Sequence, residues 1–581
     1  LSAYEFLRLT ENRLQAWKDQ QTHVLPGDED EMQRLAVSMG FDDVETFLSQ
    51  LESHRNNVHG YFELLFAAPQ ADEAEKNAFN EIWEEGISQE AAIYRLDLAG
   101  FESSEEIWSI LHDFRESRVF RNLGANGRRR IDQLMPLLLE AVAASKQADE
   151  ILRRLMPFLE SISRRTAYLA LMVENPLVLS QLIRLVRESA WIAGQMVRHP
   201  ILLDELIDPR RLYSPLKQQA LKQELQISLD TVRDDEEQTM ERLRLFVQAN
   251  TLRVAAADVT EVIPVEVVSD YLTDIAEVTT DAVYRIALEF MQNKHGLPQS
   301  TVGKESGFAV IGYGKVGGWE LGYSSDLDLV FLNDSQNSMA MTSGETGADG
   351  KKSIANDVFY ARLGQRMIHQ FTTRMSSGQL YEIDMRLRPN GNSGMLVSSL
   401  NAFEKYQMEE AWTWEHQALV RARAIAGDPL TMAGFQEVRA KILRQKRDIP
   451  KLQQDVREMR EKMRTSIDKT DSEQFDIKQG VGGIADIEFM VQYAVLRWAF
   501  DYPELVEWSD NARILEMLAD TALLPNDLAQ QLLKAYRAYR AEYHRRALQQ
   551  QKGIVPQSGF THERELVSNA WQELMINQVS E

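Results

Sequence analysis

Apolar residues recur at three- and four-residue spacings over most of the chain, which is the pattern of amphipathic helices. Two segments between residues 131 and 162 show it clearly, each with one stripe of leucine and isoleucine. Short polar or proline-containing breaks, such as residues 25–28 and 124–127, separate such segments. The pattern therefore predicts a mostly helical protein whose helices pack through their apolar faces.

Residues 307–400 depart from the helical pattern. A short apolar run ends in glycine at residue 312, and Leu327, Leu329 and Phe331 alternate with other residues, as in half-buried strands. From residue 401 to the C-terminus the helical pattern returns. The expected elements are strands at 308–312, 327–331, 380–388 and 394–397, a polar loop at 333–353 and a helix at 357–375. The chain is thus predicted to be mostly α with an embedded α/β domain.

A glycine-rich loop follows the first expected strand. Residues 310–318 read Val-Ile-Gly-Tyr-Gly-Lys-Val-Gly-Gly, which matches the dinucleotide pattern G-x-G-x-x-G, and Asp334 lies where that pattern expects an acid. A dinucleotide-binding unit needs a full crossover helix after the last glycine, whereas only residues 319–325 precede the next strand. We therefore favour a loop whose backbone N–H groups approach the phosphates of a nucleotide, with Lys315 as a point charge.

Three aspartates follow this loop. Asp326 and Asp328 lie two residues apart at the second expected strand, so their carboxylates should share one face. Asp384 lies on a later expected strand, with Arg386 and Arg388 in phase with it. Neighbouring carboxylates repel each other and need a cation, for which Mg²⁺ with its oxygen ligands is suited. The group predicts a site in which two Mg²⁺ ions hold a nucleoside triphosphate.

The same residues also fit a structural alternative. Asp384 and the two arginines could satisfy one another in an ion-pair lattice on a solvent-facing sheet. For the acid pair alone this lattice is the better account. The glycine loop upstream and the third acid downstream favour the metal site.

Composition limits the other functions. The formal net charge is −24 over 581 residues, and residues 1–110 alone carry −16, so binding to a nucleic acid is disfavoured. The absence of cysteine excludes disulfides, iron–sulfur clusters and a cysteine nucleophile. The ten histidines show no metal-binding spacing and are expected to be ordinary core or surface residues. With no long apolar run and no signal-peptide pattern, we expect a cytoplasmic protein without a membrane partner.

The order glycine loop, D-x-D, then a single aspartate resembles the nucleotidyltransferase superfamily of DNA polymerase β-like enzymes. Longer strings, among them Gly-Trp-Glu-Leu-Gly-Tyr-Ser-Ser and Trp-Thr-Trp-Glu-His, resemble the glutamine synthetase adenylyltransferase family. The resemblance runs from about residue 305 to the C-terminus and implies a polymerase β-like mixed sheet flanked by helical bundles. The matching strings occupy residues 308–332, 381–389, 410–423, 475–489 and 508–515.

Enzymes of that family have an N-terminal domain that removes AMP by phosphorolysis and a C-terminal domain that adds it. This chain begins with Leu1 and contains one glycine loop and one acid triad, so it resembles the adenylylating half with the central helical region and without the deadenylylating domain. The expected parts are an acidic helical segment from the missing domain at 1–115, a central helical regulatory region at 116–215, the nucleotidyltransferase domain at 216–435 and a C-terminal helical bundle at 436–581.

The resemblance implies a reaction in which ATP and a tyrosine of glutamine synthetase give adenylyl-tyrosine and pyrophosphate, under control of the PII signal protein and glutamine. Asp326, Asp328 and Asp384 would hold Mg²⁺, and Asp384 would also orient or deprotonate the tyrosine hydroxyl, whose ordinary pKa is near 10. The candidate nucleotide-binding residues are Gly314, Lys315, Gly317, Gly318, Ser324, Ser325, Arg386, Arg388 and Lys478.

Two alternatives stay open at this stage. A uridylyltransferase that modifies PII shares the catalytic type, although the quoted strings favour ATP. A non-catalytic regulatory scaffold would use the long acidic helical part to bind partners. Glu415, Arg421 and Arg423 are expected either to support the site or to form surface ion pairs.

Overall fold

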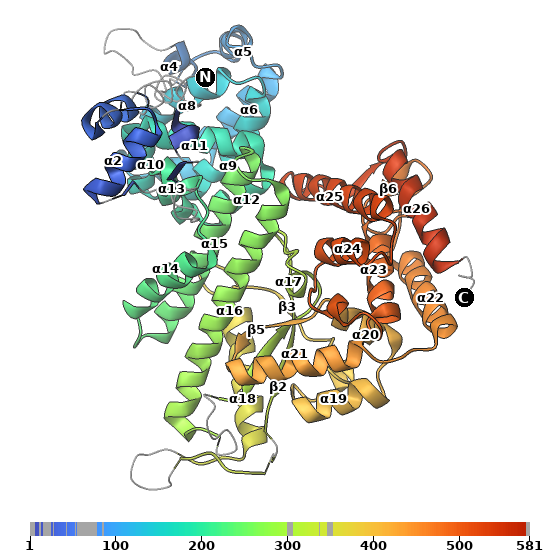
Figure 1. Ribbon diagram of the computed structural model, residues 1–581. Helices are drawn as coiled ribbons and strands as arrows, with labels where there is room; N and C mark the ends of the chain where they lie inside the picture. Colours follow the sequence, from blue (N-terminus) through green and yellow to red (C-terminus); the bar gives the residue numbers. More distant parts are fainter. Residues whose placement is uncertain are drawn as a thin grey trace. The chain divides into compact units, whose positions relative to one another are not determined.

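The computed structural model describes most of the chain (Figure 1). It divides into two compact units, an N-terminal unit, Leu1–Arg187, and a C-terminal unit, Glu188–Glu581, which are described separately. Part of the polar loop expected at 333–353 lies outside the described residues. The described residues are 6–10, 13–14, 25–26, 28–41, 43–52, 54, 78–83, 86–298, 306–335, 337, 339–344 and 352–576.

The described part of the N-terminal unit is helical, as the sequence predicts. In α9 the expected stripe is buried, including Ile151, Leu155 and Leu159, and α6 packs on α9 while α8 packs on α10. Its helices are α2 (Glu29–Ser38), α4 (Ala78–Trp83), α5 (Gln89–Leu98), α6 (Ser104–Glu116), α7 (Arg118–Arg121), α8 (Ala125–Ala143), α9 (Ala148–Ile162), α10 (Thr166–Glu174) and α11 (Pro176–Glu188).

Among the described residues no single helix is both long and apolar enough to cross a membrane. Only α10 and α11 counted together reach that length and composition, and they meet at a bend of 100°.

The C-terminal unit contains one mixed sheet. Its strands run in the order β3-β2-β1-β5, with β4 also paired to β2. β1 is antiparallel to β2 and β5, whereas β2 is parallel to β3 and β4. The antiparallel pairing of β1 with β2 excludes the dinucleotide-binding alternative, in which these two strands would be parallel. The strands are β1 (Phe308–Gly312), β2 (Leu327–Asn333), β3 (Ile383–Asp384), β4 (Val397–Ser399) and β5 (Arg423–Gly427).

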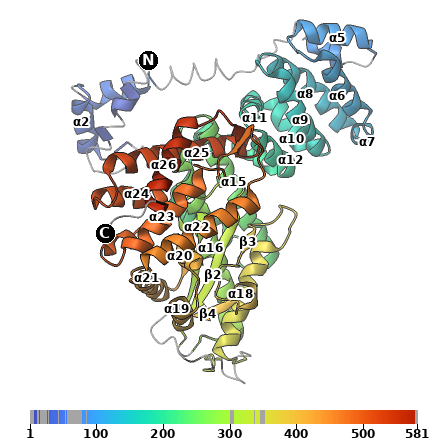
Figure 2. The same ribbon diagram turned by 90° about the vertical axis from the view of Figure 1, so that its right-hand side faces the viewer.

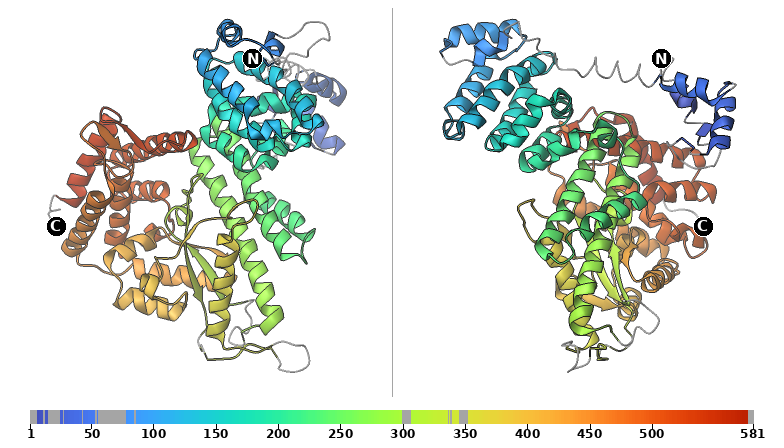
Figure 3. Two further views of the ribbon diagram at one scale, coloured as in Figure 1. Left: turned by 180° about the vertical axis from the view of Figure 1, so that it is seen from behind. Right: turned by 90° about the vertical axis from the view of Figure 1, so that its left-hand side faces the viewer.

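Helices cover both faces of this sheet (Figure 3). Val310, Leu329 and Phe331 belong to an apolar cluster shared with α16 and α18, while Ile311 and Leu332 belong to a second cluster shared with the C-terminal helices. Because both faces are buried, β1 is apolar at nearly every position rather than at alternate ones.

The helices before the sheet include α15 and α16, which are long and pack against each other. Those after α18 form the C-terminal bundle, orange to red in Figure 2. The C-terminal unit contains α12 (Ala190–Arg198), α13 (Pro209–Leu212), α14 (Gln218–Asp230), α15 (Glu236–Val259), α16 (Val265–His295), α17 (Gly314–Gly317), α18 (Asn356–Thr372), α19 (Leu400–Glu409), α20 (Thr413–Val420), α21 (Pro429–Leu443), α22 (Ile449–Ile467), α23 (Ile484–Trp498), α24 (Asn511–Asp520), α25 (Asn526–Leu548) and α26 (Thr561–Met575), with short 3₁₀ helices at Pro200–Leu206, Gly391–Ser393 and Pro503–Val506.

Two predictions of secondary structure need correction. The strand expected at 380–388 is only β3, because the chain turns after Met385 and Arg388 donates hydrogen bonds to the carbonyls of Met385 and Asn392 within that turn. The uniformly helical pattern expected after residue 401 is interrupted by β5 and by a hairpin of β6 (Gln474–Asp476) and β7 (Ile554–Pro556). β5 contains two alanines and forms only because β1 offers it an edge, which local sequence does not reveal.

Candidate active site

The three aspartates predicted to form a site do meet. Asp326 directly precedes β2, Asp328 lies in β2, and the parallel pairing of β2 with β3 sets Asp384 opposite Asp328. One carboxylate oxygen from each lies within 4.8 Å of the others. Asp326 is exposed, and the other two are half-buried.

The three acids differ in whether a nearby cation balances their negative charge. Burial, followed by the charges of Asp326 and Asp384, raises the pKa of Asp328 to about 6. Hydrogen bonds from Arg386 instead lower the pKa of Asp384, since Arg386 Nε lies 3.0 Å and 2.8 Å from the two carboxylate oxygens. Among the described residues neither Asp326 nor Asp328 has a cation within 4.0 Å. The pair therefore presents concentrated negative charge.

The backbone of the glycine loop lies close to the carboxylate of Asp328. Gly314 has a φ of +57°, and a Cβ atom there would lie 2.5 Å from Asp328 Oδ2. Three carboxylates with an open approach are the oxygen donors that a hard divalent cation such as Mg²⁺ prefers. The residues present therefore fit the expected metal.

The glycine loop contributes to the site differently from the prediction. The N–H groups of Gly317 and Gly318 donate to the carbonyls of Tyr313 and Gly314 within the turn of α17. A Cβ on Gly317 would lie 2.1 Å from the carbonyl oxygen of Arg421. These two glycines thus permit close packing and do not line the cavity, whereas Gly314 does.

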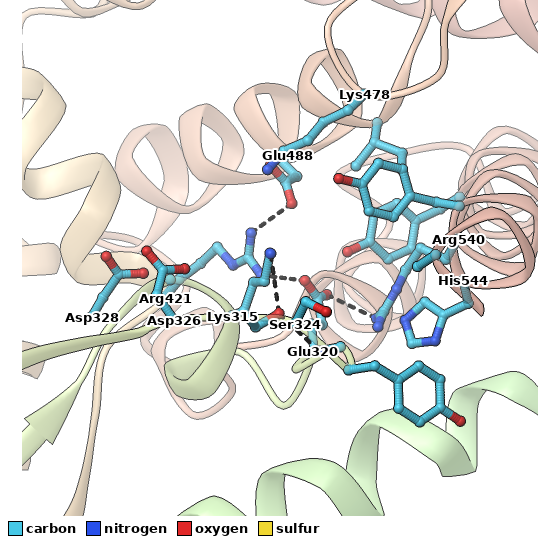
Figure 4. Close-up of a pocket in the computed structure, with 18 residues that line it drawn as sticks. Lys315, Glu320, Ser324, Asp326, Asp328, Arg421, Lys478, Glu488, Arg540 and His544 are labelled. Carbon is cyan, nitrogen blue, oxygen red and sulfur yellow. Dashed lines mark hydrogen bonds and ion pairs between the residues drawn. The ribbon is translucent and has the colours of Figure 1, made fainter. Parts of the chain in front are cut away.

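A cavity of about 370 Å³ extends from Asp326 and Asp328 toward the C-terminal helices (Figure 4). The predicted residues that line it are Gly314, Lys315, Ser324, Ser325 and Lys478, together with the two aspartates. Lys315 Nζ donates to Ser325 Oγ at 3.1 Å. Burial, and then the charge of Lys478, lowers the pKa of Lys315. Two lysines thus concentrate positive charge beside the acids.

The two predicted arginines lie elsewhere. Arg386 is exposed and bonded to Asp384, and Arg388 holds the turn that follows β3. Neither lines the cavity, because the chain leaves the strand geometry that would have kept them in phase with Asp384.

A buried ion-pair network that the sequence does not reveal lies at the floor of the cavity. Arg421 Nη1 donates to Glu488 Oε1 at 2.6 Å, and its Nη2 pairs with Glu320. Arg540 Nη1 lies 3.8 Å from the other oxygen of Glu320. Burial opposes the charge of Arg421, but Glu320 and Glu488 outweigh it and raise the pKa of this arginine. The sequence left open whether Arg421 supports the site or forms a surface ion pair, and its ion pairs with Glu320 and Glu488 are buried.

The other residues considered with Arg421 do not line the cavity. Glu415 accepts hydrogen bonds from the Tyr406 hydroxyl, at 2.8 Å, and from the Trp412 N–H. Arg423 pairs with Glu277 and donates to the carbonyls behind the glycine loop. Arg423 therefore supports the loop from behind, while Glu415 holds the start of α20.

Comparison with known proteins connects this geometry to named families. Residues 179–438 match the family model described as glutamate-ammonia ligase adenylyltransferase, and residues 1–66 and 451–554 match that of GlnD PII-uridylyltransferase. Two curated proteins named bifunctional glutamine synthetase adenylyltransferase/adenylyl-removing enzyme, from Thioalkalivibrio sulfidiphilus and Nitrosococcus oceani, are each 49% identical over 99% of this chain. The chain spans 60% of the length of each relative.

Proposed function

We propose that this chain, which belongs to the glutamate-ammonia ligase adenylyltransferase family, transfers AMP from ATP to a tyrosine hydroxyl of glutamine synthetase and releases pyrophosphate. The observation that carries the proposal is the acid triad at the mouth of a cavity that also presents Lys315 and Lys478. Carboxylates for a metal beside cations for phosphate are what nucleotidyl transfer requires.

We further propose that Asp326, Asp328 and Asp384 hold Mg²⁺, two ions by the resemblance of the chain to its superfamily. Bound Mg²⁺ would neutralise negative charge on the triphosphate and on the departing pyrophosphate. The pKa of Asp328 is raised, and no cation among the described residues lies within 4.0 Å of Asp326. Both observations support this assignment.

The residues of the cavity would hold the triphosphate. Lys315 and Lys478 offset its charge. Ser325 Oγ already accepts hydrogen bonds from Lys315 Nζ and from the Gly322 N–H, so its own hydrogen is left to donate to a phosphate oxygen. Ser324 is exposed at the same edge and is a second donor. Gly317, Gly318 and Arg388 act in this proposal as supports of the site.

Asp384 would face the acceptor tyrosine. Arg386 keeps the pKa of Asp384 low, so the carboxylate is charged and accepts a hydrogen bond from the tyrosine hydroxyl, whose ordinary pKa is about 10. A low pKa makes Asp384 a weak base, so we assign it mainly to orienting that hydroxyl. Arg386, exposed beside it, is free on one side to meet a phosphate or the incoming protein.

Regulation by the PII protein and by glutamine stays a prediction from the resemblance. A location in the cytoplasm stays a prediction from the sequence.

Transfer of radiolabelled AMP tests the proposed function. With Mg²⁺, the chain should label glutamine synthetase from α-labelled ATP, and Asp326→Ala should reduce the rate by at least about 10²–10³-fold, the range found when one transition-state contact is removed. Asp527→Ala, an exposed acid at the start of α25, should leave the rate unchanged. Undiminished transfer by the Asp326 variant would overturn the assignment.

The match of residues 1–66 and 451–554 to the PII-uridylyltransferase model supports a second candidate, uridylyl transfer to PII. The same assay with α-labelled UTP and PII as acceptor separates the two. Label on PII from UTP, and none on glutamine synthetase from ATP, would reverse our order of preference.

A further inference from the structure

A second cavity, of about 900 Å³, also reaches the acid triad. Its walls come mainly from α12, α15, the segment of residues 321–326 and the loop of residues 374–382 that leads into β3. Residues 322–326 line both cavities, so the two cavities meet at this segment and at Asp326. Neither Lys315 nor Lys478 lines the second cavity. It therefore reaches the triad without the lysines that we assign to the triphosphate.

The 374–382 loop is anchored to α15. The buried Arg244 of α15 donates a hydrogen bond from Nε to the carbonyl of Gly378 at 2.9 Å. The hydroxyls of residues 376 and 377, both serines, donate to the two carboxylate oxygens of Glu241 at 2.8 Å and 2.7 Å. Because the loop continues directly into β3, these bonds also hold the strand that carries the third acid of the triad.

The other walls of the second cavity are held in a similar way. The Tyr323 hydroxyl donates to Asp258 Oδ2 of α15 at 2.6 Å, and the Tyr323 ring lies against that of Trp191 of α12, with centroids 5.0 Å apart. The end of α12 meets the 374–382 loop at Gly378, where a Cβ would lie 3.5 Å from His199 Cε1. Helices α12 and α15 and the loop thus enclose one preformed cavity.

Two arginines that line the second cavity have no acid to balance their charge. Arg198, at the end of α12, and Arg374, in the loop, are exposed, and neither pairs with an acid among the described residues. Arg198 Nε donates to the Gly194 carbonyl of its own helix. The acids that line the cavity, Asp326 and Glu382, directly precede β2 and β3, where the triad lies. The arginines therefore offer their charge to an acidic ligand.

The chemistry of AMP transfer favours one occupant for this cavity. In such a displacement the attacking and leaving oxygens lie roughly in line, on opposite sides of the phosphorus. If Lys315 and Lys478 hold the departing pyrophosphate, the acceptor oxygen approaches from the side away from them. The second cavity reaches Asp326 without either lysine. A neutral nucleoside would make little use of two arginines, whereas a protein segment with carboxylates would pair with both.

We infer that the second cavity binds the tyrosine-bearing segment of glutamine synthetase, and that Arg198 and Arg374 pair with carboxylates that flank the tyrosine on that segment. The inference rests on the proposed function and adds the surface on which the acceptor docks. In the reaction the tyrosine oxygen forms a bond to the α-phosphorus while the bond from that phosphorus to the pyrophosphate oxygen breaks, and the hydroxyl proton passes to solvent.

Initial rates of AMP transfer by the full chain, at varied concentrations of glutamine synthetase and of ATP, test this inference. Arg198→Ala and Arg374→Ala should each raise the KM for glutamine synthetase about tenfold, as loss of one charged hydrogen bond allows, while kcat and the KM for ATP stay within about twofold. Arg374→Lys keeps the charge and should recover most of the loss. Arg457→Ala removes an exposed arginine of α22 that lines neither cavity, and it should change neither KM.

The outcomes separate docking of the acceptor from the transfer itself. An unchanged KM for glutamine synthetase in folded Arg198→Ala and Arg374→Ala would overturn the docking site and leave the proposed function standing. Weaker binding of ATP with Mg²⁺ to these variants, measured by calorimetry, without a change in the KM for glutamine synthetase would assign the second cavity to the nucleoside and also overturn the inference. Absence of transfer by the unaltered chain would instead overturn the proposed function.

Discussion

Asp274 on α16 shows what burial does to a single carboxyl group in this protein. Burial raises its pKa to about 6, and the charges of Glu277 and Asp270 add to the effect. Arg423 and Lys222 offset only part of it. The charged form of Asp274 is therefore disfavoured in the folded chain relative to the unfolded chain, where the pKa is about 3.9.

This difference predicts how stability depends on pH. The penalty is absent below about pH 4, where Asp274 is protonated in both states, and is complete above about pH 6. Asp274→Asn should stabilise the fold by about 1 kcal/mol at pH 8, after allowance for solvent screening, and by almost nothing at pH 4. Thermal melts at the two pH values check this, with Asp527→Asn as control. An equal shift at both pH values would show that the charge of Asp274 is not the cause.

At the scale of elements, the site depends on ion pairs that join helices. Arg421, which follows α20, reaches Glu320 after α17 and Glu488 on α23, and Glu320 also faces Arg540 on α25. Asn511 Nδ2, at the start of α24, donates to Glu320 Oε1 at 3.0 Å. The network thus holds the glycine loop against the C-terminal bundle, so that the acids and α25 face one cavity.

Breaking this network should be costly. Arg421→Met leaves Glu320 and Glu488 with less compensation inside the protein, and we expect a loss of about 3–5 kcal/mol in the free energy of unfolding. Arg285→Met removes an arginine that is 71% exposed and paired with Asp281, so it should cost no more than about 0.5 kcal/mol. Urea denaturation measures both. Similar losses in the two variants would contradict a special role for the network.

At the scale of the whole molecule, the proposed chemistry lies within one unit. The triad, the cavity and both apolar clusters of the sheet belong to Glu188–Glu581. The first residues of this unit are tied to the end of α25, since Ser189 Oγ donates to the Leu548 carbonyl at 2.8 Å and Gln549 Nε2 donates to that of Glu188 at 2.6 Å. The end of α25 that carries His544 is therefore held from the start of the unit.

This arrangement predicts where the chain can be shortened. A chain of residues 188–581 should unfold cooperatively and bind ATP with Mg²⁺ within about twofold of the affinity of residues 1–581. A chain of residues 200–581 lacks α12 and both contacts to the end of α25, and it should bind more weakly and melt at a lower temperature. Calorimetry and thermal melts of the two shortened chains make the comparison. Loss of binding in residues 188–581 would place part of the site in the N-terminal unit.

The sequence predicted the parts that local pattern encodes. A short apolar run located β1, and the alternation of apolar residues located β2. That alternation also placed Asp326 and Asp328 together, because side chains two apart on a strand share a face. Asp384 was found because an acid in a strand after the D-x-D pair completes a recognisable order. The mostly helical character followed from stripes such as that of α9 in the same way.

Other features were decided only by the tertiary structure. β5 forms because β1 has a free edge, Arg388 leaves the strand face because the chain turns after Met385, and Gly317 is needed because the backbone of Arg421 approaches it. The partners of Arg421, which are Glu488 and Glu320, lie 67 and 101 residues away from it along the chain. The sequence by itself determined the helical class, the first two strands and the acid triad, since these depend on spacing along the chain. Which glycine and which lysines line the cavity was decided by packing between distant segments, because no local pattern records which side chains burial will bring together.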